Sequence, residues 1–120
     1  MKILEEPKAI RLKIMDFLSR REHSSKEIYK KMVQRVDSKE LLRNSIEELI
    51  NEGLLSDERF AESYFQSRKR RGFGPLRIKN ELNQRGINED IFNSVQIDTD
   101  WSVYALEVSK RRLRAKILMS

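Results

Sequence analysis

Positively charged side chains are the residues of this sequence whose chemistry is easiest to interpret. Four consecutive cations, Arg68 to Arg71, are followed by two further basic segments. Guanidinium and ammonium groups bind phosphates and carboxylates, so these segments indicate an anionic partner. Successive helix residues point about 100° apart, so the four cations cannot all face one partner. The candidate partner-binding or DNA-binding residues are therefore spread over all three segments: Arg68, Arg71, Arg77, Lys79, Arg85, Lys110, Arg111, Arg112 and Arg114.

The distribution of charge supports the same interpretation. The chain has 120 residues and a net charge of +6; residues 1–58 contain 12 Lys and Arg against 12 Asp and Glu, whereas residues 59–120 contain 13 against 7. The whole excess lies in the second half, which favours DNA or an acidic protein as the partner. A surface that is merely basic and solvated has the same composition, so this alternative stays open.

Catalytic and metal-binding patterns are not found in the sequence. His23 is the only histidine and there is no cysteine, so we expect a turn residue and no metal site. Asp57 and Glu58 are consecutive and cannot face each other on a helix, where they suit the N-terminal dipole instead. The Gly72-Phe73-Gly74 stretch reads as a turn rather than a phosphate loop. We therefore expect neither an enzyme nor a cofactor.

Helix start and stop signals punctuate the chain. Pro7 suits a first helical position, Ser24 and Glu27 form a capping box, and Gly53 suits a helix end. Asp37 and Glu40 repeat the capping spacing. Further starts are predicted at Ser56, Gly74-Pro75, Asn88, and Asp98 or Thr99, and further ends at Gly72 and Gly86. Since no segment alternates apolar and polar residues, we predict an all-α protein.

Apolar residues also recur at an offset of 50 positions. Ile10 corresponds to Phe60, and Ile28 to Ile78. This predicts tandem three-helix repeats stacked into an elongated, curved array, because units this small bury more apolar surface by stacking. We expect repeat 1 at 8–55, repeat 2 at 56–97, and the first helix of an incomplete third repeat at 98–120. The aromatic residues have core spacing, which we favour over base stacking, and the last helix should point Trp101, Tyr104, Ala105 and Val108 inward.

The absence of cysteine and of long apolar runs indicates the cellular compartment in which the protein is expected. An apolar run of about 18 residues would be needed to span a membrane, and none occurs. Disulfides are excluded, which fits a reducing compartment. We expect a cytoplasmic monomer without membrane association.

Three stretches of the second half resemble the RecX family, whose members regulate the recombinase RecA. The stretches are Leu54-Leu55-Ser56-Asp57-Glu58-Arg59-Phe60-Ala61 with Tyr64, then Gly72-Phe73-Gly74-Pro75, and then Glu81-Leu82 with Arg85-Gly86-Ile87. The resemblance covers nearly the whole chain, since the family is also built of three-helix repeats. Its matching residues look architectural, so the exposed cations are better candidates for contact.

The resemblance implies a regulator that binds RecA nucleoprotein filaments along the helical groove. Such a regulator would restrain, mostly inhibit, ATP hydrolysis and strand exchange in homologous recombination, DNA repair and the SOS response. Single- or double-stranded DNA could be touched through its phosphates. The alternative from the residues themselves is a stand-alone helical module that binds nucleic acid without a recombinase.

Overall fold

The computed structural model describes residues 3–119, and it confirms the all-α prediction for them. The helices are α1 (Pro7–Arg20), α2 (Ser25–Met32), α3 (Lys39–Asn51), α4 (Asp57–Arg70), α5 (Pro75–Gln84), α6 (Glu89–Gln96) and α7 (Trp101–Met119), with a 3-10 turn, η1 (Val33–Arg35), after α2. The described residues contain no β-strand; Leu4 and Val36 form one isolated parallel bridge.

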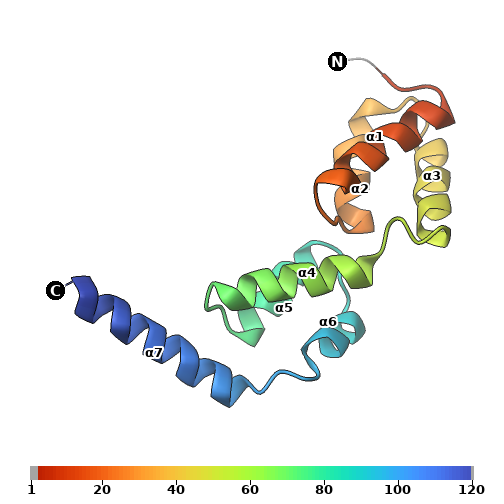
Figure 1. Ribbon diagram of the computed structural model, residues 1–120. Coiled ribbons are helices and arrows are strands. Elements are labelled where there is room, and N and C mark those ends of the chain that lie inside the picture. Colours follow the sequence, from red (N-terminus) through yellow and green to blue (C-terminus); the bar gives the residue numbers. More distant parts are fainter. Residues whose placement is uncertain (1–2, 120) are drawn as a thin grey trace.

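The internal repeat is visible in the helix positions. Helices α1, α2 and α3 begin at residues 7, 25 and 39, and α4, α5 and α6 begin 50 residues later at 57, 75 and 89. The six helices therefore form two three-helix units of the same plan, and α7 follows the second unit (Figure 1).

Most of the predicted caps are confirmed. Ser24 forms a capping box with Glu27, and Ser56 and Asn88 cap α4 and α6. Two other assignments are wrong. Ser38, not Asp37, caps α3, because the Ser38 hydroxyl directly precedes the first helical residue and accepts from Leu41 N–H. Asp100, rather than Asp98 or Thr99, caps α7, since its Oδ1 lies 3.0 Å from Ser102 N and 3.2 Å from Val103 N.

Each unit has a hydrophobic core of its own. The first core is built on Ile10, Ile14, Ile28 and Leu42, and the second on Phe60, Phe65, Ile78 and Leu82, all at most 2% exposed. The two clusters share no side chain. The units are therefore stacked without a common core, and the residues that form hydrogen bonds between them are polar.

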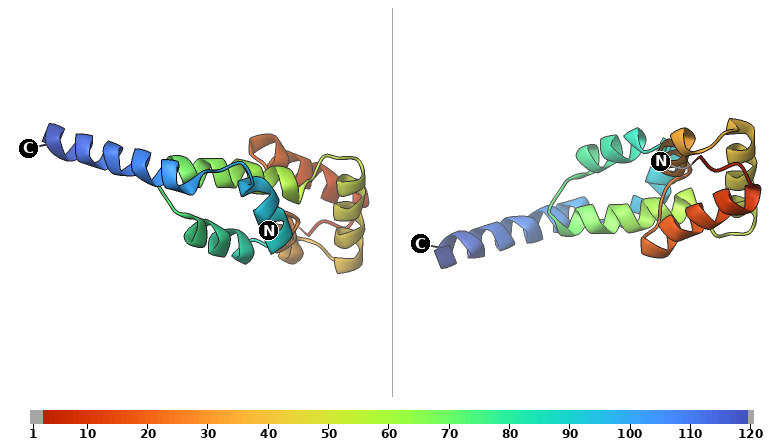
Figure 2. Two further views of the ribbon diagram at one scale, coloured as in Figure 1. Left: turned by 90° about the horizontal axis from the view of Figure 1, so that it is seen from below. Right: turned by 90° about the horizontal axis from the view of Figure 1, so that it is seen from above.

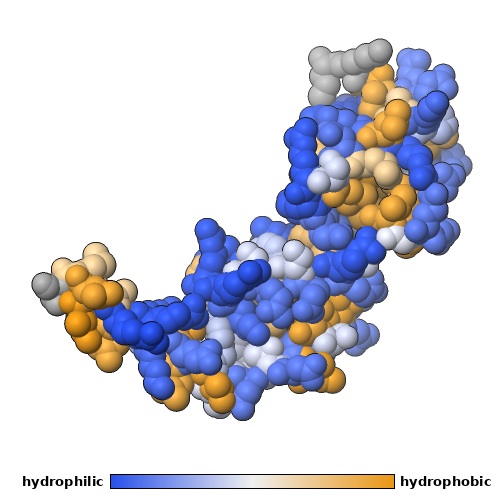
Figure 3. All heavy atoms as spheres, viewed as in Figure 1, coloured by the Kyte–Doolittle hydropathy of each residue, from blue (hydrophilic) through white to orange (hydrophobic). Residues whose placement is uncertain are grey.

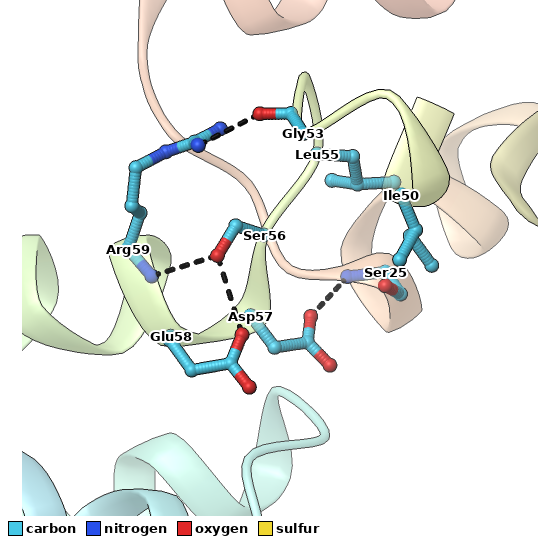
Figure 4. A pocket seen from close by; sticks show the side chains of 8 residues that line it. All are labelled: Ser25, Ile50, Gly53, Leu55, Ser56, Asp57, Glu58 and Arg59. Carbon is cyan, nitrogen blue, oxygen red and sulfur yellow. Dashed lines mark hydrogen bonds between the residues drawn. The ribbon is translucent and has the colours of Figure 1, made fainter. Parts of the chain in front are cut away.

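The junction between the units is held by hydrogen bonds. Asp57 accepts from the backbone N–H of Ser25 at 2.8 Å (Figure 4). Ser24 donates its hydroxyl to the Arg85 carbonyl at 2.7 Å. Arg59 donates to the Glu22 carboxylate at 3.0 Å and to the Gly53 carbonyl at 2.7 Å. These directional bonds fix the angle at which the second unit follows the first.

Gly86 lets the units approach closely at one more point. Its φ of +85° is in the region that disfavours side chains, and a Cβ there would lie 2.8 Å from Lys26 Cβ. Glycine is therefore required for two reasons: the positive φ disfavours any side chain, and α2 leaves no space for a Cβ.

The resulting molecule is long and curved. Its extents are 57 × 33 × 20 Å and its radius of gyration is 18.2 Å. A compact chain of this length would have a radius of gyration of about 14 Å. Figures 1 and 2 show the two units in succession, with α7 extending away from the second unit. The elongated, curved array predicted from the repeat is confirmed.

The apolar contacts of helix α7 with the second unit lie in its first half. Trp101 contacts the second core, and Val108 is 8% exposed. Ala105 is exposed, so its predicted inward position is wrong. Val103, Leu106 and Leu113 lie away from the second core and are 53%, 56% and 59% exposed. No helix in the described part of the chain combines the length and apolarity needed to cross a membrane.

Candidate partner-binding surface

Glu81 of α5 organises the polar contacts between α4 and α5. Its carboxylate accepts from Arg68 Nε at 2.8 Å and Nη2 at 2.9 Å, from the Tyr64 hydroxyl at 3.0 Å, and from Arg77 Nε at 3.3 Å. The Glu81 and Arg68 side chains are only 19% and 18% exposed. Two of the predicted contact residues, Arg68 and Arg77, thus already have a carboxylate partner, although the Arg77 side chain is 58% exposed.

These bonds stabilise the ionised form of Glu81. The bonds from Arg68, and then those from Tyr64 and Arg77, lower the pKa of Glu81 from 4.5 to about 2, although partial burial opposes the shift. Burial and the bond to Glu81 together raise the pKa of Tyr64. The cluster therefore keeps its ion pairs at neutral pH.

Phe73 completes this cluster. The Arg77 guanidinium lies 3.6 Å from the Phe73 ring centroid, and that of Arg68 lies 4.4 Å from it. Phe73 also packs against the second core. An aromatic ring this close to two guanidiniums stabilises both by cation–π contact, so this ring serves packing in the free protein.

Lys79 and Arg85 also have partners within the fold. Lys79 Nζ lies 2.6 Å from Glu89 Oε1. Arg85 donates to the Glu81 carbonyl at 2.9 Å, and its guanidinium lies 4.7 Å from the Tyr64 ring centroid. Both cations are available to a partner only if these contacts are shared or exchanged.

The docking of α7 brings Arg111 and Arg112 to the end of α4. The Tyr104 hydroxyl lies 2.6 Å from the Lys69 carbonyl and 2.8 Å from the Phe73 carbonyl, so it can donate to either. Burial raises the pKa of Tyr104. Arg111 donates to the Arg70 carbonyl at 3.1 Å. The end of α4 and the middle of α7 are thereby joined.

We call the resulting surface the basic ridge, and it consists of Arg70, Arg71, Lys110, Arg111, Arg112 and Arg114. All six residues are exposed. Within residues 3–119, the side chains of Arg71, Lys110, Arg112 and Arg114 have no hydrogen bond or ion pair. Figure 3 shows hydrophilic side chains along α7 beside the end of α4. Arg111 and Arg112 lie against the end of α4. Lys110 and Arg114 are four residues apart and point to another side of α7, because successive helix residues are about 100° apart. Of the nine predicted site residues, the ridge contains Arg71 and the four on α7, and their role in binding stays a prediction.

His23 is a turn residue, as its isolation in the sequence suggested. It is 1% exposed, and its Nδ1 lies 3.0 Å from the Arg21 carbonyl while its Nε2 lies 2.8 Å from Lys31 Nζ. Burial lowers the pKa of His23, which suits a neutral ring that accepts from the lysine.

Two features of the surface were missed from the sequence. Glu81 was not recognised as the hub of the cation cluster, although its spacing of four residues from Arg77 is a helical ion-pair signal. A groove in the first unit, which carries Lys26, Tyr29 and Arg43, was also missed. The charge balance of zero over residues 1–58 concealed that local cluster.

The fold and its surfaces define an all-helical repeat protein with an exposed basic ridge. The family model described as "RecX, second three-helix domain" matches residues 56–95. The regulatory protein RecX of Pseudomonas syringae pv. tomato is 38% identical over 117 residues, which cover 96% of this chain and 76% of the relative. That of Pseudomonas entomophila is 40% identical over 112 residues, covering 92% and 72%. The chain belongs to the RecX family.

A solved structure shares the fold. The crystal structure of a regulatory protein RecX superposes with a TM-score of 0.77 at 22% identity, and the match covers 91% of this chain but 57% of that one. At this identity the likeness concerns the arrangement of helices alone. The curated relatives are named as regulatory proteins, so a regulatory role of the RecX type follows for this chain.

Proposed function

We propose that this chain regulates the recombinase RecA by lying along the groove of its nucleoprotein filament and restraining ATP hydrolysis and strand exchange. The observation that carries the proposal is the basic ridge on an elongated, curved array. A groove that contains DNA phosphates and acidic side chains attracts unpaired guanidinium groups. The RecX resemblance supplies RecA as the partner, and no catalytic step by this chain is needed.

The ridge supports binding because four of its six cations, Arg71, Lys110, Arg112 and Arg114, have no competing partner in the described chain. Arg112 and Arg114 lack carboxylate neighbours in the described chain, whereas Arg68 and Lys79 are already paired. An unpaired surface cation can approach a partner's phosphate without first breaking an ion pair. We therefore expect the ridge to dominate the salt-dependent part of the affinity.

The test is ATP hydrolysis by RecA on single-stranded DNA at increasing concentrations of this protein. We expect the wild-type protein to lower the rate and the double variant R112E/R114E to require a much higher concentration. The double variant K8E/K39E changes the same amount of charge on exposed residues of the first unit, and it should act like wild type. An unchanged rate at saturating wild-type protein would refute the proposal.

The alternative, a stand-alone nucleic-acid-binding module, makes a different prediction. In that case duplex DNA alone would bind tightly, with a steep salt dependence, and RecA would add nothing to the affinity. Comparing binding to bare DNA with binding to RecA-coated DNA separates the two functions.

A further inference from the structure

The first unit carries a second basic surface, in a groove between α2 and α3. This α2–α3 groove has a volume of about 570 Å³ and is lined by Ser25, Lys26, Tyr29, Arg43, Ile46, Glu47 and Ile50. The two isoleucines give it an apolar wall, and the lysine and the arginine supply positive charge. Its volume is in the range of pockets that bind small molecules.

Tyr29 provides an aromatic surface in this groove. Its ring is half-buried because it packs against the first core. The Arg43 guanidinium lies 5.7 Å from the ring centroid, and Arg43 Nη2 lies 3.4 Å from the hydroxyl. The ring is therefore held in place while it still lines the groove.

Cations continue from the groove across the junction between the units. A neighbouring hollow of about 290 Å³ shares Lys26 and is also lined by Glu27, Lys30, Gln84 and Arg85. The Glu27 carboxylate is already bound to Arg21 through two contacts of 3.1 and 3.2 Å. Glu47 is the one carboxylate that lines the groove itself, where Lys26 and Arg43 are the two cations. The balance along both hollows is positive.

The second unit contains the same hollow without the charge. A hollow of about 610 Å³ is lined by Pro75, Asn93, Gln96, Ile97, Thr99 and Trp101. Its first four residues occupy the positions 50 residues after Ser25, Arg43, Ile46 and Glu47. None of its lining residues is charged. The cationic lining is therefore a property of the first unit and not a by-product of the three-helix fold.

We infer that the α2–α3 groove binds a nucleotide of a single-stranded nucleic acid, with the base against Tyr29 and Ile50 and the phosphates at Lys26 and Arg43. Aromatic rings beside a positively charged path are the elements from which single-strand sites are built. Lys30 and Arg85 would meet the next phosphate. A paired base in a duplex cannot enter such a hollow, so a single strand is the ligand. An acidic peptide would use the cations but has no need of the aromatic ring.

The experiment uses fluorescence anisotropy of a labelled oligodeoxythymidylate, with no recombinase present. We expect Tyr29→Ala to weaken binding about 5-fold or more, which is the weight of one lost stacking contact. Tyr29→Phe keeps the ring and should keep the affinity. Arg43→Asn introduces the residue found at the equivalent position of the second unit, and it should also weaken binding and reduce the salt slope by about 1.

Two controls keep the result interpretable. Asn93→Ala changes the equivalent hollow of the second unit, so it should leave the affinity unchanged. Arg43 is exposed, so its variant remains informative even if Tyr29→Ala unfolds. Photocrosslinking with an iodouracil oligonucleotide should attach Tyr29, also in the ridge variant R112E/R114E.

Wild-type affinity in both Tyr29→Ala and Arg43→Asn would overturn the inference, as would crosslinks confined to α7. It would likewise be overturned if the variants lost binding to a polyglutamate peptide but not to the oligonucleotide, because an acidic protein would then be the ligand. No recombinase takes part in this binding experiment, so a negative result here does not contradict the proposed regulation of RecA. A negative result in the ATP hydrolysis assay likewise does not contradict nucleotide binding in the α2–α3 groove.

Discussion

Asp57 of α4 accepts a hydrogen bond of 2.8 Å from the backbone N–H of Ser25, the first residue of α2. The first N–H groups of a helix have no partner within it. The carboxylate therefore satisfies a free donor of one unit from the first turn of the other. The aspartate at the start of the second repeat therefore has two roles. It interacts favourably with the dipole of α4, and it binds the first unit.

We predict that Asp57→Ala destabilises the protein by about 1–2 kcal/mol, because the Ser25 donor loses its acceptor in a half-buried place. Asp57→Asn keeps an amide oxygen and should lose less. Asp90→Ala, in the first turn of α6, is the matched control and should cost at most about 0.5 kcal/mol. Chemical denaturation measures all three. Equal losses for Asp57→Ala and Asp90→Ala would show that the bond between the units contributes nothing.

The Glu81 cluster predicts a pH dependence of stability. The folded-state pKa of about 2 lies below the ordinary value of 4.5. The unfolded chain therefore binds the proton first as the pH falls. The stabilising contribution is complete above about pH 4.5 and is lost as the pH falls towards 2.

Glu81→Gln should accordingly cost about 2 kcal/mol at pH 7, and the difference from wild type should shrink between about pH 4.5 and 2. Urea denaturation at several pH values measures it. Glu89→Gln is the control, since its partner Lys79 and the carboxylate itself are 40% and 65% exposed. Surface pairs of that kind contribute little, so a loss in Glu89→Gln as large as that in Glu81→Gln would contradict the role given to Glu81.

Substitution of two glycines allows the effect of backbone strain on stability to be measured separately from the effect of close contact between the units. Gly53 has a φ of +75°, and a Cβ added there would meet no atom within 4 Å, whereas Gly86 has a φ of +85° and a Cβ there would meet Lys26. We expect Gly53→Ala to cost about 1 kcal/mol from strain alone.

Gly86→Ala should cost about 1 kcal/mol more than Gly53→Ala, because α2 must also move away. Thermal unfolding gives the stabilities, and small-angle scattering should show a changed radius of gyration for Gly86→Ala only. If the two variants behave alike, the close approach at Lys26 has no energetic weight.

Tyr104 tests how α7 is attached. Tyr104→Phe removes the hydroxyl that lies between the Lys69 and Phe73 carbonyls, at a cost of about 1 kcal/mol. The loss should be local. We expect faster hydrogen exchange in the first half of α7 and unchanged exchange in α1 to α3. Unchanged exchange in α7 would mean that Trp101 and Val108 hold the helix without the hydroxyl.

Much of the fold could be predicted from the sequence because local signals and the repeat agree. Ser24, Ser56 and Asn88 cap helices where their spacing indicated, and the offset of 50 residues is reproduced at every helix start of the two units. The caps of α3 and α7 were misplaced because several capping residues stand next to one another, and only geometry distinguishes Ser38 from Asp37.

The surface was less predictable, because the availability of a charge depends on residues distant in the sequence. Arg68 and Arg112 look alike in the sequence. The first is bound by Glu81, 13 residues away, while the second has no such neighbour in the part of the chain that the structure describes. Likewise the groove around Tyr29 forms only because α3 packs beside α2. The sequence of neither helix alone predicts this packing.

The separation of the two cores has a mechanical consequence. Since no apolar side chain is shared, the two units can tilt relative to each other by exchanging the bonds of Ser24, Asp57 and Arg59 for bonds to water, and no core is opened in the process. Bending at this joint thus costs a few exchanged polar contacts, whereas bending within either unit would expose buried hydrocarbon. The angle that these bonds fix would therefore change at the junction before either unit deforms.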